Sequence, residues 1–130
     1  MIIDKALIDR LHEEACKSER LRVNFDLRDP QDEVSLRLLT VLEPGSKVPI
    51  HRHRDTAEVL CLISGMIEER YYDDCGNLLE RFVLSKDGDI GALIIPQGQW
   101  HNLIVLEERS AILECRRGPY YPTPKEDILE

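Results

Sequence analysis

Short apolar runs separated by turn signals at nearly regular intervals are the feature that most constrains the fold of this chain. From Arg22 onward the pattern becomes strand-like. The runs expected to form further strands are residues 34–42, 48–53, 58–63, 66–72, 79–84, 92–95, 101–106 and 111–116. Gly, Pro, Asp and Asn gather between them, as in the hairpin signal at 73–77. Short strands with such turns favour a sandwich or barrel of antiparallel strands.

Two other segments depart from the strand pattern. Residues 4–16 are expected to form a helix, because Asp4 can act as an N-cap and Leu7, Leu11 and Ala15 recur on one face. Within it, His12 has acidic neighbours and is expected to be a solvated surface residue. The proline-rich stretch 118–124 is expected to lie extended over the barrel. We therefore expect one domain, with an N-terminal helix in 1–20 packing on a barrel formed by 21–130.

Charge narrows the classes of partner. The formal net charge is −8 and the pI is near 5.0, so neither nucleic acid nor an anionic membrane surface is an expected partner. The N-terminal stretch carries charge throughout and does not resemble a signal peptide. The cytoplasm is the expected compartment, where all four cysteines would be free thiols (Cys16, Cys61, Cys75 and Cys115).

The histidines suggest a metal site. His51 and His53 are two residues apart on an expected strand, so their side chains would point to the same face. Glu58 begins the next, otherwise apolar strand and can return alongside them. His101 follows the turn of residues 96–99 and opens another apolar strand. The alternative is that the His-x-His pair belongs to an ordinary polar face, but that leaves the surrounding glycines and the glutamate unexplained.

This donor set indicates which metals would bind. Three imidazoles and a carboxylate suit Zn, Fe, Mn or Ni better than Ca or Mg. We therefore predict one divalent transition metal held by His51, His53, Glu58 and His101, with its identity open. A small molecule would be the ligand of such a centre.

The same spacings resemble a known family. Residues 45–65 match the first motif of the cupins, and Pro96, Gly98 and His101 match the core of the second. Beyond the motifs, the chain resembles the WbuC-type cupin-fold metalloproteins over roughly residues 4–126, on the segments 21–25, 37–45, 51–53, 96–101 and 118–120. The resemblance implies an all-β jelly-roll cupin barrel with the metal inside, a short N-terminal helix, a cytoplasmic location and a homodimer.

The chain departs from the family pattern at a few positions. The second motif usually has Asn where this chain has Val105, and its leading Gly is replaced by Ile90. WbuC-type chains often carry a histidine near Asp26 and Arg28. The last difference bears on what the pocket binds.

Four further residues are candidates for binding substrate. Arg37 lies within an apolar strand and would either clamp an anionic group or form a structural ion pair. Gln97 and Trp100 flank His101, and Trp100 would stack on a sugar ring or pack at the rim. Tyr120 would close the barrel mouth or support a dimer contact.

Three hypotheses for function stay open, because fold does not determine chemistry. The first is a metal-dependent enzyme, such as an isomerase or epimerase, acting on a sugar or sugar-derived acid, with the metal as Lewis acid. The resemblance alone connects it with O-antigen or surface-polysaccharide biosynthesis. The second is a non-haem Fe(II) dioxygenase, and the third is a non-catalytic module that binds a small ligand through the metal.

Overall fold

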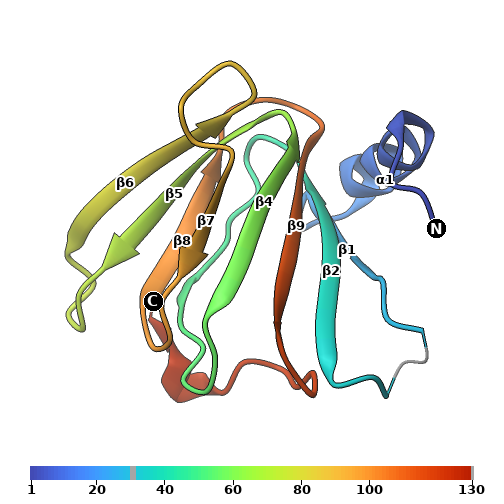
Figure 1. Ribbon diagram of the computed structural model, residues 1–130. Helices are drawn as coiled ribbons and strands as arrows, with labels where there is room; N and C mark the ends of the chain where they lie inside the picture. Colours follow the sequence, from blue (N-terminus) through green and yellow to red (C-terminus); the bar gives the residue numbers. More distant parts are fainter. Residues whose placement is uncertain (30–31, 130) are drawn as a thin grey trace.

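A computed structural model describes residues 1–29 and 32–129 (Figure 1). It contains one α-helix and ten strands within those residues. Their bounds are α1 Lys5–Lys17, β1 Arg22–Asp26, β2 Ser35–Leu42, β3 Ile50–His51, β4 Glu58–Ser64, β5 Met66–Tyr72, β6 Leu78–Ser85, β7 Ala92–Ile95, β8 Trp100–Val105, β9 Ser110–Arg117 and β10 Ile128–Leu129, with a 3-10 turn over Lys125–Asp127. Each expected strand is present, with its ends within a few residues of those predicted.

The strands form two antiparallel five-stranded sheets. The first sheet has the order β1-β2-β9-β4-β7, and the second has the order β10-β3-β8-β5-β6. Among the described residues no strand ladder joins the two sheets, so the expected closed barrel is observed as two facing sheets of a jelly roll. Within the second sheet, β3 is short and pairs with β8 at a single position. Pro49 has no N–H to extend that ladder.

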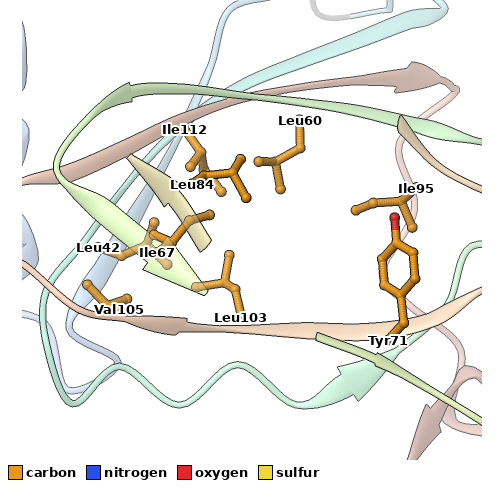
Figure 2. Close-up of a cluster of buried hydrophobic side chains, with 9 residues drawn as sticks. All are labelled: Leu42, Leu60, Ile67, Tyr71, Leu84, Ile95, Leu103, Val105 and Ile112. Carbon is orange, nitrogen blue, oxygen red and sulfur yellow. The ribbon is translucent and has the colours of Figure 1, made fainter. Parts of the chain in front are cut away.

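The hydrophobic core lies between the two sheets. Nine buried side chains contributed by both sheets form it, as Figure 2 shows: Leu42, Leu60, Ile67, Tyr71, Leu84, Ile95, Leu103, Val105 and Ile112. Strand residues alternate between the two faces of a sheet. The positions two residues away from the core side chains on each strand therefore also point inward, and several of these positions are polar.

The helix packs on the outer face of the first sheet (Figure 1). Ile8 and Leu11 contact Leu39 and Val41, which alternate with the inward residues of β2. As predicted, Asp4 caps the helix by accepting a hydrogen bond from the Leu7 backbone N–H. The prediction for His12 was wrong. Its side chain is 14% exposed because it meets the Glu43 carboxylate where β2 ends.

The C-terminal segment returns to the strand that carries the first histidines. No strand or helix is assigned to residues 118–124, in line with their expected extended course, but β10 then pairs with β3, with Ile128 opposite His51. Asp127 reinforces this by accepting hydrogen bonds from Arg52 and Arg54. The sequence did not predict β10, because two residues show no periodicity. Within the described part of the chain, no helix is long and apolar enough to cross a membrane.

The turn between β4 and β5 yields a stability prediction. Gly65 has φ +79°, and a Cβ there would lie 2.3 Å from Ser110 Oγ and 2.6 Å from Ser110 Cα. Gly65→Ala should therefore lower the free energy of unfolding by about 3 kcal/mol, measured by urea denaturation. Gly76→Ala is the matched control, because Gly76 has φ +83° with nothing within 4 Å of its Cβ position. Its cost should be only the backbone strain, about 1 kcal/mol. Equal losses in the two variants would contradict the steric argument.

Candidate metal centre

Three histidines converge on the inner side of the second sheet. His51 on β3 lies directly opposite His101 on β8, and His53 follows two residues after His51. The centroids of the His51 and His101 rings are 4.3 Å apart. One ring nitrogen from each of the three residues lies within 4.8 Å of the other two. Two segments distant in sequence thus place three imidazoles around one point.

The hydrogen bonds of two rings determine which nitrogen is free. His51 Nδ1 lies 2.8 Å from the Pro49 carbonyl oxygen, and His101 Nδ1 lies 2.8 Å from the Gln99 carbonyl oxygen. A carbonyl only accepts, so each Nδ1 donates and each Nε2 keeps its lone pair. His53 Nε2 is buried and has no hydrogen-bond partner among the described residues. Three available nitrogens of this kind fit a transition metal.

The protonation state of the histidines also fits a metal. Burial lowers the pKa of His51 to about 4 and that of His53 to about 2. Burial likewise lowers the pKa of His101. All three imidazoles are therefore neutral near pH 7, which is the form that coordinates a cation.

Glu58 lies beside the histidines. It is 1% exposed, and its two carboxylate oxygens are 3.8 Å from His53 Nε2 and 3.5 Å from His101 Nε2. Two ligands on one metal are separated by about 3 Å or slightly more, given metal–ligand bonds of about 2.1 Å. Arg116, opposite Glu58 in the β4–β9 ladder, donates to Glu58 Oε1 at 2.9 Å. The arrangement brings Glu58 near the three nitrogens and offsets its charge with a guanidinium.

These residues line a cavity of about 240 Å³. Among the residues expected to bind substrate, Tyr120 lines it, and its side chain is also largely exposed. Arg20 is exposed as well and contributes to the same lining. We therefore place the opening of the cavity beside Arg20 and Tyr120.

The structure does not bring the other three expected substrate-binding residues to this cavity. Arg37 alternates with the inward Leu38 on β2, so it lies on the outer face, where it forms a two-pronged ion pair with Glu33. Gln97 donates to the Arg54 carbonyl. Trp100 alternates with His101 and is buried elsewhere, beneath Arg52 and hydrogen-bonded to an aspartate.

Sequence reasoning missed two acids that line the cavity, the buried Glu69 and the partly buried Glu114. Glu114 accepts a hydrogen bond from Thr40. Burial and the nearby Glu58 carboxylate raise the pKa of Glu114 to about 8, and burial raises the pKa of Glu69 well above its usual value. A signal was available, because Glu69 stands two residues from Ile67 on β5 and Glu114 two residues from Ile112 on β9. Alternation directs both acids inward.

The lowered histidine pKa values predict the pH dependence of stability in the metal-free protein. As pH falls below about 6.5, His51 becomes protonated in the unfolded chain, whereas in the folded chain it stays neutral until about pH 4. Stability should therefore fall over that window. His51→Gln cannot be protonated, so its loss of unfolding free energy between pH 7 and pH 4.5 should be smaller by about 2 kcal/mol. Urea unfolding in the presence of a chelator measures this difference, and equal losses would contradict it.

The comparisons with known proteins come from sequence and from structure. Residues 3–84 match a family described as a domain of unknown function, DUF6016. No curated protein matches the sequence. The structure is similar to KdgF from a Halomonas species, with a TM-score of 0.53, 19% identity, and coverage of 67% of this chain and 72% of that chain.

Two larger proteins contain a similar part. The capsular polysaccharide assembling protein CapF of Staphylococcus aureus has a TM-score of 0.60 at 18% identity, covering 75% of this chain and 26% of its own. Oxalate oxidase in complex with the substrate analogue glycolate has a TM-score of 0.60 at 17% identity, covering 76% and 51%. The chain thus spans about a quarter and a half of these two proteins. At such identities the likeness shows the fold, which is that of the cupins. The chain belongs to the DUF6016 family, and its two facing sheets have the cupin fold.

Proposed function

We propose that this chain is a WbuC-type cupin metalloprotein that acts on a small polar molecule, a sugar or a sugar-derived acid. One divalent transition metal would be held by His51, His53, Glu58 and His101. The observation that carries the proposal is the convergence of three neutral imidazoles, with Nε2 of His53 buried and unpartnered among the described residues, at the wall of a cavity. A metal bound there would supply Lewis acidity, polarising a carbonyl or hydroxyl oxygen of the ligand.

The cavity lining favours a polar ligand. Asn24, Thr40 and Asn102 offer amide and hydroxyl groups, and Arg22 is a half-buried cation. Arg22 is positioned by hydrogen bonds from its Nη1 to the Lys47 carbonyl oxygen at 2.8 Å and to Ser46 Oγ. A guanidinium suits a carboxylate. The placement of Arg22 therefore supports an acidic ligand entering past Tyr120.

Glu69 is the residue best placed to exchange a proton with such a ligand. It lies on β5 opposite Leu103, on the same face as His101. Both of its carboxylate oxygens are buried and have no hydrogen-bond partner among the described residues. Because burial raises its pKa well above the usual value, Glu69 can hold a proton near neutral pH. This favours an enzyme over a passive binding module.

The comparisons support the same class of ligand. CapF is a capsular polysaccharide assembling protein, and oxalate oxidase binds the small hydroxy acid glycolate. An oxalate decarboxylase of the same fold was solved in complex with formate. We therefore propose a role in surface-polysaccharide biosynthesis, in line with the WbuC resemblance.

Metal content tests the proposed centre. The variant with both His51→Ala and His53→Ala should carry about one equivalent of metal less than the wild type, by plasma mass spectrometry, because it lacks two of three nitrogen donors. Arg54→Ala is the matched control in the same segment, since its side chain is half exposed and points to Asp127. Equal metal content in the wild type and the double variant would overturn the site. Iron in the wild type would direct the search to oxygen-consuming reactions, whereas zinc, nickel or manganese would direct it to isomerisation.

Glu69 yields a separate prediction. The pKa of Glu69 is higher in the folded chain than in the unfolded chain, so as pH rises this carboxyl ionises first in the unfolded chain. Glu69 therefore lowers the free energy of unfolding at neutral pH. Glutamine does not ionise, so Glu69→Gln removes this cost and should raise the free energy of unfolding at pH 7 by about 1 kcal/mol or more, since each unit of pKa difference between the folded and unfolded states is about 1.4 kcal/mol. Metal content should not change. Glu68→Gln is the control, because Glu68 points outward and pairs with Arg70. A loss of stability in Glu69→Gln would show that the carboxylate has a structural role.

A further inference from the structure

A second cluster of metal-binding side chains lies where the helix meets the first sheet. His12 and Cys16 are one helical turn apart on α1, so they share a face. Glu43 follows directly after β2. One ligand atom from each of the three residues lies within 4.8 Å of the other two. We propose that His12, Cys16 and Glu43 form a metal site for a thiophilic divalent cation such as Zn²⁺, which fastens α1 to the sheet.

The distances are close to those of a shared cation. Cys16 Sγ lies 3.8 Å from each ring nitrogen of His12. A thiolate and an imidazole on one tetrahedral zinc are about 3.6 Å apart, given bonds of about 2.3 Å and 2.1 Å. His12 Nδ1 is in hydrogen-bond contact with Glu43 Oε1. A cation would take the place of the proton between these two atoms, which would move apart to the spacing of two ligands on one metal.

Burial and neighbouring groups hold two of the ligands in place. The side chains of His12 and Glu43 are 14% and 7% exposed. The Arg109 backbone N–H lies 3.2 Å from both oxygens of Glu43 and orients the carboxylate, as the second shell of a metal site does. Cys16 is exposed. The cation could therefore enter from solvent and keep water as its fourth ligand.

The charges balance. Binding would release the thiol proton of Cys16 to solvent. The proton on His12 Nδ1 would be lost to solvent from an imidazolium or transferred to Nε2 in a neutral imidazole, which frees Nδ1 to coordinate. A thiolate, a carboxylate and a neutral imidazole then compensate the two charges of the cation. The donor set of sulfur, nitrogen and oxygen favours zinc over magnesium or calcium.

This cluster is separate from the cavity. His12 and Cys16 belong to α1, which packs against Leu39 and Val41 on the outer face of β2. The alternating residues Leu38 and Thr40 face the cavity. Among the described residues no cysteine lines the cavity. A metal-to-thiolate signal therefore distinguishes the second site from the proposed site at His51, and the inference does not depend on the proposed function.

Cobalt(II) is the probe for the test. Reduced, chelator-treated full-length protein should develop a thiolate-to-cobalt charge-transfer band in the near ultraviolet that saturates at one equivalent for this site. Zinc should abolish the band. Cys16→Ser should lack it and bind one equivalent of cobalt less than the wild type. Cys75→Ser is the matched control, because Cys75 is also exposed and lies in the turn between β5 and β6. This variant and the double variant His51→Ala, His53→Ala should both keep the band.

Thiol protection provides a second readout. Zinc should slow the alkylation of Cys16 by iodoacetamide at least tenfold and leave Cys75 unchanged, measured by peptide mass spectrometry. Absence of the band in the wild type, or its persistence in Cys16→Ser, would overturn the proposal. Loss of the band in the double histidine variant would also overturn it, since the thiolate would then belong to the other centre. If the wild type shows the band but binds no second equivalent of cobalt, this site stands and only the first is overturned.

Discussion

Burial of ionisable side chains between two apolar sheets is the constraint on which the rest of the structure depends. Removing a carboxylate from water is costly unless it finds a proton, a cation or hydrogen bonds. Glu58 has a guanidinium on one side and two imidazoles within 4 Å on the other. Burial and the nearby Glu58 carboxylate raise the pKa of Glu114 to about 8. The polar side chains that line the cavity therefore form an ordered network between the two sheets. This part of the interior is not an extension of the hydrophobic core.

The sheet registers position this network. His51 faces His101 across the β3–β8 ladder, while Glu58 faces Arg116 across the β4–β9 ladder. The two pairs belong to different sheets, so the centre exists only when the sheets face each other. Burial lowers the pKa of the three imidazoles and raises the pKa of Glu69 and Glu114, because it always disfavours the charged form. Neutral imidazoles beside protonated acids are a suitable setting for a metal and for proton exchange.

The two faces of β2 separate the two clusters of candidate metal ligands. Inward residues of this strand line the cavity, and outward residues carry the helix. Glu43 comes directly after the strand and reaches the helix, where it meets His12. The short helix, which buries only one stripe of apolar residues, is thus also joined to the sheet by polar contacts. The two-residue repeat of β2 thus places the cavity on one face of the strand and the helix on the other.

The sequence by itself determined the strands and the helix with its Asp4 cap, because these depend on local periodicity and on spacing within a few residues. It also predicted His51, His53, Glu58 and His101 as one set of metal ligands. It did not determine that Arg37 lies outside the cavity, since the face of a strand depends on which side meets the partner sheet. Nor did it show that Glu69 and Glu114 lie together, or that His12 is shielded by Glu43. These are contacts between segments far apart in the chain. Only the tertiary structure decided them, because the burial that gives such groups their chemistry arises when the two sheets and the helix come together.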